Sequence, residues 1–275
     1  MLVKKMYDNN EISGKIYCQL CNLFIEALLQ EDKDFFMGYS LNIMHKLNAI
    51  KYHLNNYKKI EEIQYQKTKQ LLKKGKINQD EQLELIFELE AFLFQIKSSL
   101  DMLTKLLIPI IGRNMIHTQT YGDKGDKLIK GLEQYKKKTG VNIEAVDNLI
   151  TLMKDAKDSW LENVISARDK LNHLEGLRNY NFNHRTLING QLVVEKPKFD
   201  DMNTVHYMEL VYSNNLDFHQ DFIVLALAIK TPSCFCIIPK DPKEAIQEYG
   251  ELGKYIKYAW GMKNSAIPGD AINSL

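Results

Sequence analysis

Three side chains in one short stretch combine the two chemistries needed to act on a phosphate group. Arg168 carries a permanent positive charge on a planar fork of N–H donors, which fits phosphate oxygens. His173, five positions later, has a ring that takes and gives a proton near neutral pH. Asp169 precedes His173 by four residues, so in a helix it would share a face with the ring and accept its N–H. This run is therefore the first candidate for a functional site.

The run 168–173, Arg-Asp-Lys-Leu-Asn-His, resembles the signature of the HEPN superfamily, in which an Arg and a polar residue precede a His by four to six residues. Members of that family are small helical bundles, and many are metal-independent ribonucleases in toxin–antitoxin, CRISPR and anti-phage systems. Residues 88–103, with Glu90 and Asp101 as polar positions in an apolar helix, also resemble an early bundle helix of the family. The resemblance covers roughly residues 80–230.

The resemblance implies cleavage of RNA by attack of a 2′-hydroxyl on the adjacent phosphate. His173 would take the hydroxyl proton, and Arg168 would stabilise the charge on the crowded phosphorane. Asp169 would support the ring, and Asn172 stands four residues after Arg168 as a further polar neighbour. No metal or cofactor is needed for this reaction, and none is expected.

One straight helix does not bring Arg168 and His173 together, because positions five apart differ by about 140° in direction. Arg168 falls at the margin of the helix's apolar stripe, whereas His173 points to the opposite side. Either the helix bends here or the site forms in a cleft between two subunits, and the resemblance implies the second solution. A homodimer is also indicated by the long apolar stripe of residues 34–74, which exceeds what one small bundle can cover.

Other arrangements of the same residue types remain open. Arg178 and His184 also fit the signature, with an Asn directly after the Arg, but they lie in a loop-like, Asn-rich segment. Glu90 and Asp101 are eleven residues apart and share one side of a helix, where they could reach a bound ligand or be paired at the edge of the core. The Arg and His of either run could also be ordinary solvated helix surface.

Composition limits the class of protein. The chain has 275 residues, 45% of them hydrophobic, and a formal net charge of +1, which argues against a strongly electrostatic, non-specific binder of nucleic acids. Six prolines and fourteen glycines are few for this length and favour helices. No secretory signal and no apolar run of membrane-spanning length is visible, so we expect a cytosolic protein without membrane association.

Four cysteines raise the question of a metal site. Cys18 and Cys21 could form half of a zinc site, with Cys234 and Cys236 as the other half. The first pair, however, lies in an amphipathic helical pattern, and the spacing of the second is uncommon for zinc. Reduced, metal-free cysteines are the preferred interpretation.

The periodicity of apolar residues predicts the elements that must position these side chains. Helices are expected over 13–30, over 34–74 with Gly75 as a stop, over 80–108 and over 123–138, and from a cap at Asn142 towards residue 174 with one break. Two more are expected over 216–230 and 242–258, and the tail after Trp260 is expected to be loose. Asn189-Gly190 between apolar runs predicts a hairpin over 186–194, and β-forming residues predict a third strand over 204–212.

Together these patterns predict a mainly α, HEPN-like helical bundle with a small inserted β-hairpin or three-stranded β segment. The expected division is an N-terminal helical extension over 1–75, the bundle over 78–232 with its β insertion near 185–212, and a C-terminal helix and tail over 233–275. The expected function is a metal-independent endoribonuclease in prokaryotic defence or a toxin–antitoxin system, with RNA, a second copy and an antitoxin or other regulatory protein as partners. The alternatives are a non-catalytic module that binds a nucleotide or a protein, and a helical scaffold.

Overall fold

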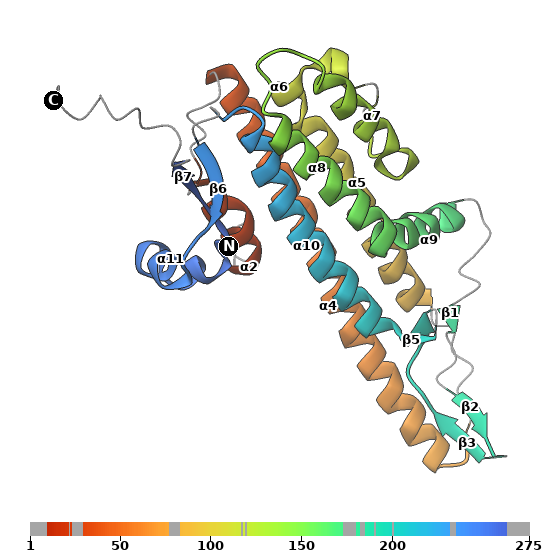
Figure 1. Ribbon diagram of the computed structural model, residues 1–275. Coiled ribbons are helices and arrows are strands. Elements are labelled where there is room, and N and C mark those ends of the chain that lie inside the picture. Colours follow the sequence, from red (N-terminus) through yellow and green to blue (C-terminus); the bar gives the residue numbers. More distant parts are fainter. Residues whose placement is uncertain are drawn as a thin grey trace, which may run out of the picture. The chain divides into compact units, whose positions relative to one another are not determined.

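The computed structural model describes residues 10–21, 23, 30–76, 83–116, 118, 120–172, 180–181, 185–189, 191–199, 201–231 and 235–262 (Figure 1). The predicted mainly α fold with a small β insertion is confirmed. The chain forms two compact units: residues 1–45, 99–159 and 216–275 make the first, and residues 46–98 and 160–215 the second. Both units are assembled from separate stretches of the chain.

The longest element is helix α4, Gln30–Lys73, which confirms the helix predicted over 34–74. Gly75 ends it as expected, with a φ of +68° that favours glycine. Its N–H donates to the carbonyl of Leu72, and the N–H of Lys76 donates to that of Leu71, which is the Schellman arrangement of a helix end. The local sequence therefore sets both the length and the end of α4.

The second unit is built from parts of three long helices and one shorter one. These are α4, α5 (Leu83–Leu106), α9 (Glu162–Asn172) and α10 (Thr204–Ala228). The strand predicted over 204–212 is wrong, because α10 already begins at Thr204. The carboxamide oxygen of Asn203 accepts a hydrogen bond from the His206 N–H at 3.1 Å, as a helix N-cap does. Met208, Val211 and Tyr212 are buried at helical spacing, which overrides the β propensity of this stretch.

The β insertion of the second unit is small. Strands β2, Arg185–Ile188, and β3, Gln191–Val194, form the predicted hairpin, and Asn189 at its turn has a φ of +51°. Strands β1 (Tyr180–Asn181), β4 (Lys198–Phe199) and β5 (Met202–Asn203) form a three-stranded antiparallel sheet in the order β1-β4-β5.

The first unit holds the helices that follow α5. These are α6 (Ile108–Ile111), the 3-10 turns Arg113–Met115 and Asp123–Gly125, α7 (Asp126–Tyr135) and α8 (Ile143–Ala156). Asn142 caps α8 as predicted, since its side chain accepts a hydrogen bond from the Ala145 N–H at 3.3 Å. A π-helical turn, Lys157–Leu161, separates α8 from α9 and accounts for the break expected in this helix.

Segments from both ends of the described chain also contact one another in the first unit. They are α2 (Asn10–Ile12), the π-helix η1 (Ser13–Cys18), α3 (Gln19–Cys21), β6 (Phe235–Pro239), α11 (Pro242–Tyr249), the 3-10 helix η6 (Gly250–Tyr255) and β7 (Tyr258–Met262). Strands β6 and β7 pair antiparallel, and η6 packs against α11 and η1 (Figure 1). We call this group the terminal lobe.

The terminal lobe corrects two sequence predictions. The last helix ends at Tyr249 and not near residue 258, because Gly250 has a φ of +61° and starts a 3-10 helix. Strand β7 runs to Met262, two residues into the tail that was expected to be loose after Trp260, and the rest of that tail lies outside the described residues. Residues 24–29, the second half of the helix predicted over 13–30, lie outside the described residues.

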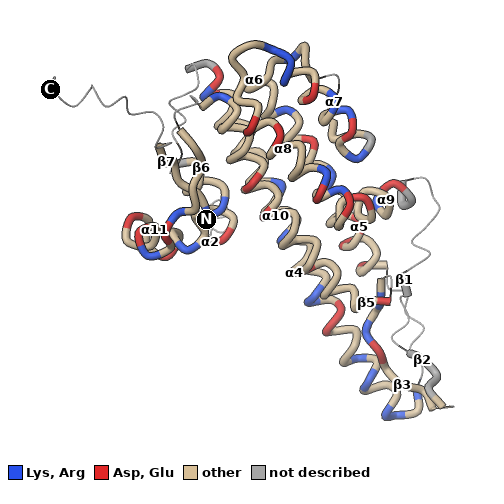
Figure 2. The backbone as a smooth tube through the Cα atoms, viewed as in Figure 1, with Lys and Arg blue, Asp and Glu red and all other residues tan. Residues whose placement is uncertain are grey.

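Acidic and basic residues are both spread over the described chain, in keeping with the near-zero net charge (Figure 2). No helix in the described part of the chain has the length and apolar character needed to cross a lipid bilayer.

Candidate functional site

Arg168 lies in the second half of α9 and is held by contacts from two directions. The carbon at the centre of its guanidinium lies 5.0 Å from the centroid of the Phe94 ring on α5, within the range of a cation–π interaction. Nη1 donates to Oδ1 of Asp169 at 2.9 Å. The side chain is 25% exposed, so it lies at the margin of the core, as its place beside the apolar stripe predicts. A guanidinium fixed in this way can present donors to a phosphate at little further entropic cost.

The structure describes only part of the predicted run. Asp169 pairs with Arg168, and its side chain is 48% exposed. Asn172 is the last residue of α9, and its side chain is not described. His173, Arg178 and His184 lie outside the described residues, so the choice between the two runs stays a prediction.

Glu90 and Asp101 have different surroundings. Glu90 is half-buried on α5, one turn before Phe94, and therefore shares a helix face with the ring that contacts Arg168. Oδ1 of Asp101 accepts a hydrogen bond from the backbone N–H of Tyr121 at 2.7 Å. Asp101 thus ties the segment before α7 to α5, while Glu90 lies one turn from the ring that contacts Arg168.

Sequence reasoning missed a second polar cluster in the same unit. Nδ1 of His53 on α4 lies 2.7 Å from Oε2 of Glu88 on α5, and the other oxygen of Glu88 accepts from Asn56 at 3.3 Å. Lys46 and Gln95 add a further α4–α5 hydrogen bond at 3.2 Å. Because His53 and Glu88 are 35 residues apart, no local spacing could have paired them. The cluster links two helices, and it provides a His–carboxylate pair of the kind that can hold a proton.

A buried carboxyl group marks the contact between α4 and the segment after the hairpin. Glu61 is 1% exposed, and its Oε2 lies 3.1 Å from Nζ of Lys196, which also contacts Glu62 at 2.9 Å. Burial raises the pKa of Glu61 above its ordinary value, although the hydrogen bond from Lys196 opposes this shift. Lys196 therefore holds the chain between β3 and β4 on α4.

The cysteines do not gather in the part that is described. Cys18 is buried and Cys236 is half-buried. The side chain of Cys21 and all of Cys234 lie outside the described residues, so a site that uses all four remains untested. Within the described ranges, no three His, Cys, Asp or Glu side chains group as metal ligands would.

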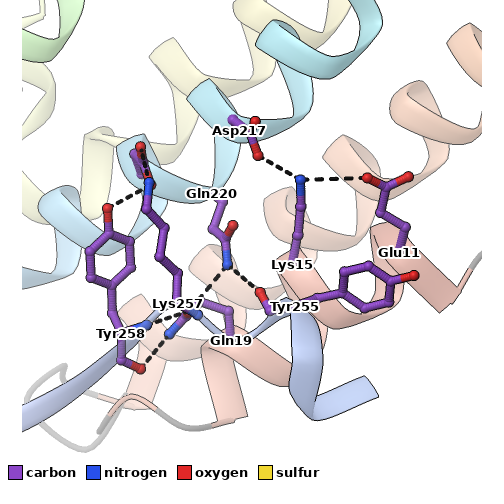
Figure 3. Close-up of polar contacts among 9 residues, drawn as sticks. Glu11, Lys15, Gln19, Asp217, Gln220, Tyr255, Lys257 and Tyr258 are labelled. Carbon is purple, nitrogen blue, oxygen red and sulfur yellow. Dashed lines mark hydrogen bonds and ion pairs between the residues drawn. The ribbon is translucent and has the colours of Figure 1, made fainter. Parts of the chain in front are cut away.

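A cluster of hydrogen-bonded amide groups links the terminal lobe to α10 within the first unit (Figure 3). Oε1 of Gln19 accepts hydrogen bonds from the backbone N–H groups of Lys257 and Tyr258, at 2.8 and 3.1 Å, and from Nε2 of Gln220 at 3.2 Å. Its own amide donates to the carbonyl of Tyr258 at 3.0 Å, and Gln220 donates to that of Tyr255 at 2.8 Å. Gln19 and Gln220 are 1% and 2% exposed. This amide cluster binds α3 and α10 to the strand β7.

Ion pairs surround the amide cluster. Asp221 accepts from Nζ of Lys257 and from the Tyr258 hydroxyl, each at 2.8 Å, and Lys15 lies 2.5 Å from Asp217 (Figure 3). Burial, followed by the charge of Asp221, raises the pKa of Tyr258 to about 12, so the hydroxyl stays a donor at neutral pH. These groups hold the lobe together and offer no group poised for chemistry.

The chain matches no protein-family model, no curated protein and no solved structure.

Proposed function

We propose that this protein is a metal-independent endoribonuclease of the HEPN type, with Arg168 and His173 at its reacting centre. The observation that supports the proposal best is the setting of Arg168. Its guanidinium is fixed by the Phe94 ring and by Asp169. The side chain of Arg168 is 25% exposed, and His173 follows it by five residues. A charged donor fixed near a proton-accepting ring is the minimum that RNA cleavage by internal attack requires.

In the proposed reaction, His173 takes the proton of a 2′-hydroxyl while that oxygen forms a bond to the adjacent phosphorus. Arg168 donates to the phosphorane oxygens as negative charge develops on them. The bond from phosphorus to the 5′-oxygen then breaks, and this oxygen takes up a proton. The products are one RNA end with a 2′,3′-cyclic phosphate and one with a 5′-hydroxyl.

The proposed assembly is a homodimer whose cleft brings Arg168 of one copy near His173 of the other, because one straight helix directs the two side chains apart. RNA is then the substrate, and the cytoplasm is the proposed compartment. An antitoxin or other regulatory protein would restrain the activity. The context of prokaryotic defence or a toxin–antitoxin system comes from the HEPN resemblance alone.

The direct test is cleavage of RNA by the purified chain in the presence of a metal chelator. We expect products that carry 2′,3′-cyclic phosphates, and His173→Ala should abolish cleavage while leaving RNA binding within a few-fold of wild type. His206→Ala is the matched control, because His206 is an exposed histidine of the same unit that is remote from α9 in sequence. Cleavage that requires added divalent metal would disprove the mechanism.

Further variants separate the two candidate runs. Arg168→Ala should weaken both cleavage and binding, since a charged hydrogen bond to phosphate contributes about 1.5–3 kcal/mol. Asp169→Asn should reduce the rate less than His173→Ala does. If His184→Ala loses activity while His173→Ala keeps it, the working pair is Arg178 and His184.

A non-catalytic binding module is the second candidate, and one observation favours it. Asp169 pairs with Arg168 and offsets its charge, which reduces the donor strength available to a phosphorane. Under this alternative the wild-type chain binds RNA or a nucleotide without cleaving it, and Arg168→Ala weakens binding only. If none of these variants differs from wild type in either assay, a helical scaffold is left.

A further inference from the structure

A cavity of about 500 Å³ opens in the first unit, near helix α6. The first turns of α4, the last turn of α5, α6 and the segment after it provide its walls. The described residues that line it are Phe35, Tyr39, Lys105, Ile108, Arg113, Ile116 and Thr118. Its volume falls within the range of about 300–1,000 Å³ that is typical of sites for small molecules.

The charged groups of this cavity have one sign. Lys105 and Arg113 are its only charged lining residues in the described chain, and both are positive. Neither forms an ion pair with any described residue. Six other lysines of the same unit are paired with carboxylates: Lys15, Lys136, Lys157, Lys240, Lys254 and Lys257. Two unneutralised cations at one concave site favour an anionic ligand.

The ends of helices account for these cations only in part. Lys105 lies in the last turn of α5, and Arg113 follows Gly112, which ends α6. A positive charge at a helix C-terminus is favourable for the helix itself. That effect explains why each of the two positions holds a basic residue. It does not explain why both residues line one cavity together with two aromatic rings.

The rings provide the second, independent observation. Phe35 is 36% exposed, and its ring centroid lies 4.6 Å from that of Tyr39 with the planes tilted by 48°. The Tyr39 hydroxyl forms no hydrogen bond with the described part of the chain. A phenylalanine ring left open to water costs burial energy that a flat ligand would recover by stacking on it.

We propose that this cavity binds a small molecule that joins a phosphate group to a planar aromatic ring, as a nucleoside monophosphate does. Lys105 and Arg113 hold the phosphate, and Phe35 and Tyr39 contact the ring. Because all the lining residues that the structure describes belong to the first unit, the site does not depend on Arg168 or on the proposed ribonuclease activity.

Titration calorimetry on the full chain tests the proposal with three probes: adenosine 5′-monophosphate, adenosine and inorganic phosphate. We expect the monophosphate to bind at least about tenfold more tightly than either part alone, which corresponds to about 1.4 kcal/mol. Equal binding of inorganic phosphate and the monophosphate would show a site for any anion and overturn the role of the rings. No binding of any probe at millimolar concentration would overturn the whole proposal.

The double variant Lys105→Gln/Arg113→Gln should weaken monophosphate binding by at least about tenfold. The matched control is Lys130→Gln/Lys137→Gln, which removes two exposed lysine charges from the α7 region of the same unit. An equal loss in both double variants would reduce the effect to net charge and contradict the proposal. Phe35→Leu, at an exposed position, tests the stacking contact even if the double variant is unstable, and it should weaken the monophosphate but not inorganic phosphate.

Discussion

The amide cluster around Gln19 and the Arg168 contact show two uses of polar side chains. Gln19 and Gln220 are uncharged, almost fully buried and bonded chiefly to the backbone. Arg168 is charged, partly exposed and held by a ring and an adjacent carboxylate. A buried amide bonded to backbone groups stabilises one arrangement of the chain, whereas an exposed, fixed charge is available to a ligand. Mutations in the amide cluster should therefore lower stability, whereas mutations at Arg168 should lower the proposed activity.

The largest effect on stability is expected for Gly253→Ala in the terminal lobe. A Cβ at Gly253 would lie 2.0 Å from the carbonyl oxygen of Ala245, and backbone atoms cannot move aside as a flexible side chain can. We expect a loss of about 3 kcal/mol or more, measured by chemical denaturation. Gly38→Ala is the control, because nothing lies within 4 Å of its Cβ in α4. It should stabilise the chain by about 0.5–1 kcal/mol, and the reverse order would contradict the packing described for the lobe.

Gln19→Leu should have the next largest effect. It leaves the N–H groups of Lys257 and Tyr258 without the acceptor that they share. An unsatisfied buried group costs about 1–3 kcal/mol, so we expect a loss of about 3 kcal/mol in the free energy of unfolding. Gln247→Leu, at an exposed position of α11, should change it by less than about 0.5 kcal/mol. RNA cleavage by the folded fraction should not change in either variant.

Arg168→Met should have the opposite effect to Gln19→Leu, with a small loss of stability and a large loss of the proposed activity. Methionine keeps much of the apolar stem but loses the charge, so the contacts of the guanidinium with Phe94 and Asp169 are removed. We expect a loss of about 1 kcal/mol in stability. RNA binding and cleavage should fall much more, and the two quantities are measured on the same preparation. A stability loss as large as that of Gln19→Leu would mean that Arg168 serves mainly to stabilise the fold.

The smallest predicted effect is a change of folding stability with pH, caused by the carboxyl group of Glu61. Burial raises its pKa in the folded state, so its stabilising contribution is complete below the unfolded value of 4.5 and is lost as the pH rises through the raised value. Glu61→Gln removes this titration. The variant should therefore gain stability relative to wild type between pH 4 and pH 7, as measured by urea denaturation at each pH. A constant difference across this range would mean that Glu61 keeps its ordinary pKa in the folded chain.

Local signals gave the most accurate sequence predictions. The stop at Gly75, the cap at Asn142 and the turn at Asn189 depend on neighbouring residues, and all three are confirmed. At residues 204–212, β-forming side chains predicted a strand, and the prediction was wrong because a helix begins there with Asn203 at its cap. Strand β6 had no clear local pattern, and its pairing with β7 joins residues that are 19 to 27 positions apart.

The candidate sites show the same limit. The chemistry and the marginal exposure of Arg168 could be predicted from the run and the apolar stripe beside it. Its contact with Phe94 could not, because helix packing brings α5 to α9 across 74 residues of chain. The cavity at Lys105 and Arg113 was missed for the same reason, since its walls come from segments whose residue types are unremarkable when taken one at a time.

The bonds of Gln19 also constrain the order in which the chain can fold. Tyr258 follows Gln19 by 239 residues, so a growing chain cannot complete this cluster until almost all of the described sequence has been synthesised. Contacts of such long sequence separation carry a large loop-closure entropy and form late. Helices α4 and α5 can meet much earlier through the bond between Lys46 and Gln95, which closes only 49 residues. During synthesis, the first helices must therefore stay soluble without the partners that finally bury Gln19.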